Sequence, residues 1–172
     1  MKEDRTFTVM ESPLGKILLA GSKRGLTQVS FQDGENPLFP GDGWRRDDEL
    51  WATAVCQLAA YFAGELQEFD LPLAPEGTPF QQQVWAYLQT IPYGRTITYG
   101  AIAEALGQPN ASRAVGAANG RNPIAIIIPC HRVIGSSGKL TGYASGLKFK
   151  QALLGLERYG RLGTAQQLSI FS

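Results

Sequence analysis

The feature that most constrains the fold is the run Ile124-Ala125-Ile126-Ile127-Ile128, which lies between two prolines and leads into Cys130-His131-Arg132. Four of its five residues are β-branched, and a short apolar run bounded by prolines predicts a buried strand. A histidine and an arginine directly after such a strand are costly to bury unless the strand ends at a polar site. We therefore expect the apolar run to be part of the core and to end at a functional site.

Cys130 is a candidate nucleophile because it stands beside His131, the only histidine in the chain. A thiol is a strong nucleophile as a thiolate, which a neighbouring base promotes. Most cysteines that follow an apolar run are small core residues instead, and the adjoining His131-Arg132 pair argues against that interpretation. Adjacent side chains of an extended segment point to opposite faces, so Cys130 and His131 need either a turn or a bridging water to communicate.

A catalytic histidine usually needs a third group that fixes its tautomer and stabilises its charged form. The C-terminal half offers three acids, Glu76, Glu104 and Glu157. Glu157 follows the apolar helix predicted over 147–156, where an unpaired carboxylate would be poorly placed. We therefore choose Glu157 as the partner of His131.

Composition limits the class of protein. The chain has 172 residues, of which 44% are hydrophobic and 18% charged, as in a soluble globular protein. It contains no apolar stretch of membrane-spanning length and begins without the apolar core of a secretory signal, so we expect a cytoplasmic protein with no membrane partner. Two cysteines, Cys56 and Cys130, suggest a reducing compartment, and with one histidine they cannot build a zinc site from Cys and His, so no metal is expected. Cys56 is expected in the core.

Charge divides unevenly along the chain. Residues 1–75 carry seven Lys and Arg against twelve Asp and Glu, a net charge of −5. Residues 76–172 carry nine against three, a net charge of +6, and the two halves together give the +1 of the whole chain. A basic C-terminal half favours a polyanionic partner, and chance segregation of surface charge is the alternative.

The first half predicts a small antiparallel sheet followed by a helix. Strands are expected over 6–10, 16–20 and 26–31, and residues 32–46 read as an irregular loop. A helical apolar period then runs from Asp47 or Asp48 to Ala63, with its buried face at Leu50, Trp51, Ala54, Val55, Leu58 and Phe62. The proline-bracketed stretch 71–79 is the expected linker between a domain of residues 1–75 and a domain of residues 76–172.

The second half predicts helices and a short β pair. A helix is expected over 80–90 and the β pair around 95–98. Residues 99–119 have the size of a helix-turn-helix, with helices over 99–106 and 111–118 and Asn110 as the N-cap of the second. Small residues fill that second helix, and Arg113 is its one long side chain. An ordinary helical hairpin packed in a core is the alternative.

The chain resembles the O6-alkylguanine-DNA alkyltransferases, also called methylated-DNA–protein-cysteine methyltransferases. The resemblance rests on Pro129-Cys130-His131-Arg132-Val133, Arg113-Ala114-Val115-Gly116, Asn122-Pro123, Tyr99, Gly142-Tyr143, and Leu153-Leu154 followed by Glu157. It covers the C-terminal half closely and the N-terminal half in general plan. It implies an N-terminal ribonuclease-H-like α/β domain with a small antiparallel sheet, and a C-terminal winged helix-turn-helix domain.

The resemblance also implies a reaction. The alkyl group of O6-alkylguanine, and of O4-methylthymine, would pass from double-stranded DNA to Cys130, once per protein molecule and without a cofactor. The target nucleotide must first leave the base stack, because the alkyl group cannot be attacked in line inside a duplex. The helix-turn-helix would bind the minor groove, and the free protein would be a monomer, with cooperative assembly on DNA left open.

Roles within the site follow from the same resemblance. His131, through a water, and Glu157 would activate Cys130, and Asn122 would be the hinge between the recognition helix and the cysteine segment. Tyr99 would rotate the nucleotide and protonate N3 of the departing guanine.

Other matched residues would hold the DNA and the base. Arg113 would fill the space of the extruded base, and Ala114 and Gly116 would let the helix approach the backbone. Backbone carbonyls of Cys130 and Val133 would accept from the guanine amino group, and a loop with Tyr143, Ala144 and Ser145 would cover the base.

Ser145 stands where the family often has glycine, and its bulk predicts reduced tolerance for large groups such as O6-benzyl. Two other functions remain as rivals. A regulator or damage sensor would bind DNA without chemistry, and a cysteine hydrolase would turn over an ester or amide with Cys130 and His131.

Overall fold

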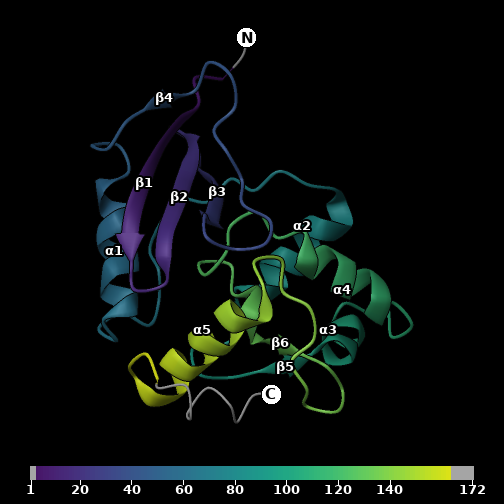
Figure 1. Ribbon diagram of the computed structural model, residues 1–172. Helices are drawn as coiled ribbons and strands as arrows, with labels where there is room; N and C mark the ends of the chain where they lie inside the picture. Colours follow the sequence, from purple (N-terminus) through teal and green to yellow (C-terminus); the bar gives the residue numbers. More distant parts are fainter. Residues whose placement is uncertain (1–2, 164–172) are drawn as a thin grey trace.

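In the computed structural model, which describes residues 3–163, the first third of the chain forms a sheet in the strand order β3-β2-β1-β4 (Figure 1). β1 (Thr6–Ser12), β2 (Gly15–Ser22) and β3 (Gly25–Phe31) pair antiparallel, which confirms the three predicted strands. β4 (Arg45–Arg46) runs parallel to β1 and interrupts the stretch predicted as an irregular loop.

Helix α1 (Ala52–Phe62) lies along the sheet (Figure 1). Its buried residues Ala54, Leu58, Tyr61 and Phe62 follow the spacing of one helical face. The predicted start at Asp47 or Asp48 is wrong, and Leu50, predicted on the buried face, is 41% exposed.

The prediction that Cys56 is a core residue is also wrong. Cys56 is exposed, as is the neighbouring Thr53. In a helix that buries positions 54, 58, 61 and 62, position 56 falls on the opposite face. Cys56 is therefore accessible to thiol reagents in the folded protein.

Residues 79–134 contain three α-helices and a β pair, and a fourth α-helix, α5, follows them. α2 (Pro79–Leu88) begins with a capping box between Thr78 and Gln81. α3 (Tyr99–Ala105) begins where the Thr98 hydroxyl accepts from the Ala101 amide at 3.1 Å. α4 (Ser112–Gly120) packs against both. β5 (Ile97–Thr98) pairs parallel with β6 (Val133–Ile134). The predicted cap at Asn110 is wrong, because Ala111 occupies the cap position and no side chain caps α4.

The predicted strand over 124–128 is wrong, although its burial is confirmed. Ile124 forms an isolated parallel bridge with Val29 of β3, and the chain then turns, with the Ile128 amide donating to the Ile124 carbonyl at 3.1 Å. Ile126 has a φ of 73°, which is rare for a β-branched residue. Composition alone did not distinguish a buried strand from a buried turn, because both require apolar side chains.

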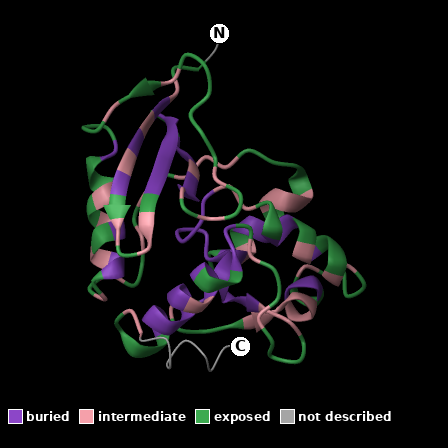
Figure 2. Ribbon diagram, in the orientation of Figure 1, coloured by how far each residue is buried: buried purple, intermediate pink, exposed green. Residues whose placement is uncertain are grey.

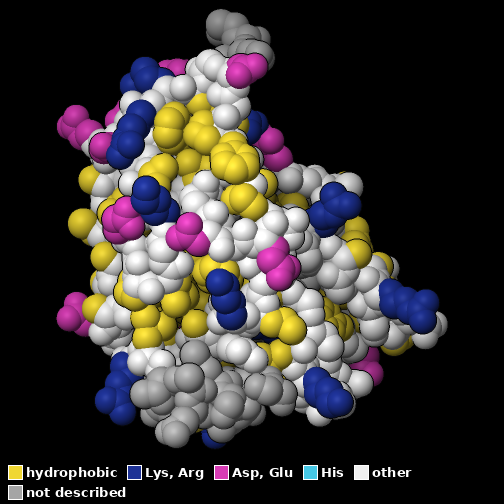
Figure 3. Space-filling model, viewed as in Figure 1, with side chains coloured by type: hydrophobic (Ala, Val, Ile, Leu, Met, Phe, Trp, Pro, Cys, Tyr) yellow, Lys and Arg dark blue, Asp and Glu magenta, His cyan; other side chains and the backbone are white. Residues whose placement is uncertain are grey.

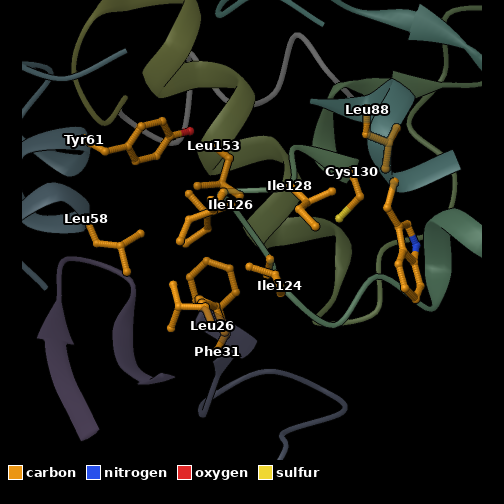
Figure 4. Packing of buried hydrophobic residues seen from close by; sticks show 14 of the residues in the cluster. Leu26, Phe31, Leu58, Tyr61, Leu88, Ile124, Ile126, Ile128, Cys130 and Leu153 are labelled. Atoms are coloured by element: carbon orange, nitrogen blue, oxygen red, sulfur yellow. The ribbon is translucent and has the colours of Figure 1, made fainter. Parts of the chain in front are cut away.

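Both halves of the chain share one hydrophobic core. Ile124, Ile126 and Ile128 point into the same cluster as Leu26 of β3 and Leu153 of α5 (Leu147–Tyr159) (Figure 4). Buried residues run from β2 through the centre of the molecule to α5 (Figure 2). Cys130 lies within this continuous packing, so the two halves position the thiol together. Within residues 3–163, no helix combines the length and the apolar character needed to cross a membrane.

Candidate active site

Cys130 opens a single 3₁₀ turn, η1 (Cys130–Arg132), directly after Pro129. The Cys130 amide donates to the Ile128 carbonyl at 2.8 Å, and the side chain is 6% exposed. A turn is one of the two arrangements that would let Cys130 and His131 communicate. Because the backbone turns here, the two side chains are not forced to opposite faces as they would be in an extended strand.

The cysteine borders a cavity of about 740 Å³ between the two halves of the chain. This volume is in the range of small-molecule sites. β3 and the connection that follows it supply one wall, and the C-terminal half supplies the others. The predicted site residues that line it are Tyr99, Gly116, Asn122, Cys130, Tyr143, Ala144 and Ser145. Residues that are far apart in the sequence therefore meet around one sulfur.

The remaining predicted residues lie elsewhere. Arg113 and Ala114 are exposed on α4. Val133 is fully buried in β6, and its side chain is part of the core. His131 and Glu157 are buried and do not line the cavity. The arrangement thus has an exposed helix face on α4, a cavity with the thiol, and a buried acid–base pair.

The buried pair joins η1 to α5. The Nε2 atom of His131 lies 2.5 Å from Oε2 of Glu157, and both side chains are almost fully buried. Glu157 is thus the acid that meets the histidine, as the sequence predicted. The other ring nitrogen, Nδ1, has no hydrogen-bond partner among the described residues and is available to exchange a proton.

Further groups surround the Glu157 carboxylate. Arg132 donates from Nε to Oε1 at 2.7 Å and from Nη2 to Oε2 at 3.1 Å. The Tyr61 hydroxyl donates to Oε2 at 2.6 Å, and the Gly94 amide donates to Oε1 at 3.1 Å. Burial alone would raise the pKa of Glu157, but His131 and Arg132 outweigh it and hold that pKa far below its usual range. Glu157 is therefore a carboxylate at any physiological pH.

The resting thiol is in a different electrostatic state. Burial raises the pKa of Cys130 above its ordinary value, and Asn122, Lys150 and Tyr143 lower it only in part. The sulfur is therefore protonated at neutral pH. A reaction at this site needs a base at the moment of attack, which matches the separate His131–Glu157 pair.

Asn122 shapes the turn that precedes the cysteine. Its Nδ2 donates to the carbonyls of Ile124 at 3.3 Å and Ile128 at 2.8 Å, and its Oδ1 accepts from the Ile124 amide at 3.0 Å. These contacts span the residue with positive φ, Ile126. The asparagine follows directly on the end of α4. It therefore links the position of α4 to that of Cys130.

Lys150 is a site residue that the sequence did not reveal. Its side chain is fully buried in α5, and Nζ donates to the carbonyls of Thr141 at 2.9 Å and Gly142 at 3.4 Å. Burial lowers the pKa of Lys150 to about 8, and the nearby Cys130 opposes part of this shift by raising that pKa. The sequence contains one signal for Lys150: it stands three residues before Leu153, on the apolar face of the same helix.

Two other residues were missed. Asn119 is buried, and its Nδ2 donates to the Cys130 carbonyl at 3.3 Å. Tyr61 reaches Glu157 from α1, ninety-six residues away. No local pattern identifies Tyr61, since its role depends on how α1 packs against α5.

The motifs around this site match one family along nearly the whole chain. The family model "6-O-methylguanine DNA methyltransferase, ribonuclease-like domain" matches residues 6–75, and the model "6-O-methylguanine DNA methyltransferase, DNA binding domain" matches residues 79–159. The chain belongs to the methylated-DNA–protein-cysteine methyltransferase family. The resemblance drawn from the sequence is thereby confirmed.

Individual members of this methyltransferase family are close relatives. The methylated-DNA–protein-cysteine methyltransferase of Methanosarcina acetivorans is 59% identical over 151 residues, which cover 88% of this chain and 97% of the relative. That of Mycolicibacterium paratuberculosis is 55% identical over 153 residues, with 88% and 92% covered.

A solved structure of a methyltransferase from this family has the same fold. The crystal structure of Mycobacterium tuberculosis OGT in complex with DNA superposes with a TM-score of 0.86 at 49% identity, covering 97% of this chain and 99% of that one. The predicted fold class, a ribonuclease-like α/β unit followed by a helix-turn-helix unit, is confirmed by this match and by the two family models.

Proposed function

We propose that Cys130 accepts the alkyl group of O6-alkylguanine in double-stranded DNA, in one irreversible transfer for each protein molecule. The family reaction is direct alkyl transfer from DNA to a protein cysteine, and it is the repair activity of this chain. The single observation that carries the assignment to Cys130 is its position. The thiol borders a cavity large enough to admit a nucleobase, and its neighbour His131 is paired to Glu157 behind it.

The first step is activation of the thiol. Nδ1 of His131, through a bridging water, takes the proton from the Cys130 sulfur, and the imidazolium that results is stabilised by the Glu157 carboxylate. Arg132 keeps that carboxylate ionised before and during the transfer. Asn122, Lys150 and Tyr143 favour the thiolate as it forms.

The second step is a displacement at carbon. The thiolate attacks the alkyl carbon, a C–S bond forms, and the C–O6 bond breaks with its electron pair leaving on the guanine. A proton from Tyr99 at N3 would neutralise the departing base. The thioether product has no hydrolytic route back to a thiol, so a second turnover does not occur.

DNA reaches this cavity through α3 and α4. Arg113 and Ala114 are exposed on α4, and Gly116 of the same helix lines the cavity. Separate dark blue Lys and Arg side chains stand out along the edge of the molecule where α4 lies (Figure 3). Of α2, α3 and α4, only α4 contributes such a side chain, Arg113. We assign α4 to the minor groove, with Arg113 filling the gap left by the extruded nucleotide and Tyr99 assisting its rotation. The buried sulfur supports extrusion, since a base stacked in a duplex could not enter the cavity.

The remaining features of the proposal follow from the same site. Residues 76–172 carry the DNA contacts and the thiol, and residues 1–75 support them from the other side of the cavity. Cys130 must stay a free thiol to react, which favours a reducing compartment, the cytoplasm. O4-methylthymine is proposed as a second substrate. The free protein is proposed to be a monomer.

Incubation with duplex DNA that carries tritiated O6-methylguanine tests the assignment. We expect one equivalent of label per protein, recovered in the peptide that contains Cys130. The Cys130→Ala variant should take up no label yet bind the duplex, and Cys56→Ser should behave as the native protein. Label on another residue, or repair without labelled protein, would contradict the proposal. Turnover of an ester or amide would instead favour the hydrolase rival.

A further inference from the structure

Two loops that are far apart in the sequence meet at the mouth of the cavity. The first, which we call the clamp loop, is residues 33–36, after β3. The second, the pocket loop, is residues 141–146, before α5. The Glu35 amide donates to the Ser145 carbonyl at 3.0 Å, and the Asn36 Nδ2 donates to the Ala144 carbonyl at 2.6 Å. The N-terminal half therefore holds the loop that covers the cavity.

Gly34 shows how closely the two loops pack. A Cβ atom at position 34 would lie 2.8 Å from the Ser145 carbonyl oxygen and 2.9 Å from the Ser145 Cβ. The φ of Gly34 is not in the left-handed region, so its backbone does not itself demand glycine. The contact with Ser145 is what demands it, and an alanine here would act as a wedge between the loops.

The clamp loop and the residues on either side of it are fixed to the sheet. The Leu38 amide donates to the Ser30 hydroxyl at 3.0 Å, and Gln32 donates from Nε2 to the Leu38 carbonyl at 3.0 Å. The Lys16 amide of β2 donates to Asp33 at 3.3 Å. The clamp loop therefore presents its donors from a fixed position.

The pocket loop is anchored at its other end as well. Lys150 donates to the carbonyls of Thr141 and Gly142, and the Tyr99 hydroxyl donates to the Thr141 carbonyl at 3.2 Å. Between these two anchors lie Tyr143, Ala144 and Ser145, all of which line the cavity. The space beside Cys130 thus depends on where the clamp loop holds Ala144 and Ser145.

We propose that the clamp loop sets the upper size of the O6 substituent that can enter beside Cys130. Asn36 and Gly34 are specificity-determining positioning residues, which act on the substrate through the pocket loop. This inference rests on the proposed function. It predicts that the native protein favours methyl over benzyl, and that loosening either contact shifts this preference towards benzyl.

The test compares rate constants for transfer from duplexes that carry O6-methylguanine or O6-benzylguanine. Asn36→Ala removes one donor, and Gly34→Ala inserts a methyl group between the loops. In Asn36→Ala we expect the benzyl-to-methyl ratio to rise roughly five- to tenfold, as expected for the loss of about one hydrogen bond. In Gly34→Ala we expect a rise in the same direction, because the added methyl group displaces the Ser145 carbonyl that accepts from the Glu35 amide. Asp42→Ala, an exposed change on the same connection, should leave the ratio unchanged.

Amide hydrogen exchange, thermal stability and the transfer rates together separate the possible outcomes. Amide hydrogen exchange in residues 141–146 should speed up in Asn36→Ala, whereas thermal stability should be close to native because the Asn36 side chain is exposed. An unchanged ratio in both variants, with methyl transfer intact, overturns the clamp and leaves the proposed function standing. Failure of the native protein to take up methyl from O6-methylguanine would remove the proposed function itself.

Discussion

Cys130 and His131 are consecutive in the chain, yet Cys130 borders the cavity whereas His131 is buried behind it against Glu157. The 3₁₀ turn that begins at Cys130 allows this division. The sulfur can meet a substrate, and the buried imidazole remains screened from the substrate and from bulk solvent. The base and its carboxylate therefore do not compete with the alkylated nucleobase for space.

Replacement of Glu157 by glutamine should slow alkyl transfer by about 10²- to 10⁴-fold, the usual contribution of general-base catalysis. Glutamine keeps the shape of the side chain but cannot stabilise the imidazolium of His131. Single-turnover transfer from O6-methylguanine DNA measures the effect. Glu104→Gln changes an exposed acid of the same half and should react at the native rate.

Glu157→Gln also leaves the buried Arg132 without its counter-charge, which costs about 3–5 kcal/mol of stability. Circular dichroism must therefore confirm folding before rates are compared. Tyr61→Phe is a milder change, because it removes one of the donors to Oε2 and keeps both charges. A native rate in folded Glu157→Gln would exclude the pair from the reaction.

Acid should lower the free energy of unfolding of the native protein more than that of the Glu157→Gln variant. The pKa of Glu157 is depressed in the folded state below the ordinary value of 4.5, so its ionic contacts stabilise the fold above that pH. As the pH falls below about 4.5 the unfolded state takes up the proton first, and this stabilisation is progressively lost. Urea unfolding at several pH values should show the difference between the two proteins shrinking with acid. A difference independent of pH would contradict the depressed pKa.

The reacting residues of the site were easier to predict from the sequence than the residues that position them. Cys130, His131 and Glu157 could be chosen because reactive residue types are rare in the C-terminal half, with one histidine and three acids. Asn36, Tyr61 and Lys150 act on backbone carbonyls or on residues of another element. Nothing near Asn36 or Tyr61 in the sequence marks them, and Lys150 is marked only by its place on the apolar face of its helix. Their roles exist only once the two halves are packed.

The fold was predictable to a similar degree. Strands with alternating patterns and helices with long apolar periods were correct to within a few residues. The errors fall where local patterns are ambiguous. The buried turn over 124–128 has the composition of a strand, and it is held by the Asn122 side chain as well as by backbone hydrogen bonds of its own residues.

Asn122→Ala should therefore both destabilise the protein and slow the reaction. It removes one acceptor and two donated bonds from a part-buried turn, so we expect a loss of about 1–3 kcal/mol in the free energy of unfolding. Transfer should slow because Cys130 follows this turn. Urea unfolding and single-turnover rates measure the two effects. Asn110→Ala is the matched control, since Asn110 is exposed and does not cap α4.

Lys150→Met should raise the pKa of Cys130 further. The Lys150 ammonium group lowers that pKa in the native protein, and its own pKa of about 8 leaves it largely charged at neutral pH. The rate of Cys130 alkylation by iodoacetamide, followed against pH, reports the thiol directly. Both proteins need the Cys56→Ser background, because the exposed Cys56 would react first. Lys148→Met, an exposed change in the same helix, should leave the profile in place.

Arg113→Ala should separate nucleotide extrusion from chemistry. Arg113 is exposed on α4 and does not line the cavity, so its removal should leave folding and the cavity intact. Extrusion of the nucleotide costs a few kcal/mol, and in the variant no side chain fills the gap that it leaves. Reaction with duplex O6-methylguanine should therefore slow by at least about tenfold. Reaction with free O6-benzylguanine, which needs no extrusion, should keep its native rate. Arg95→Ala removes another exposed charge of the same half and should affect neither substrate. Equal slowing of both substrates by Arg113→Ala would place the arginine in the pocket chemistry instead.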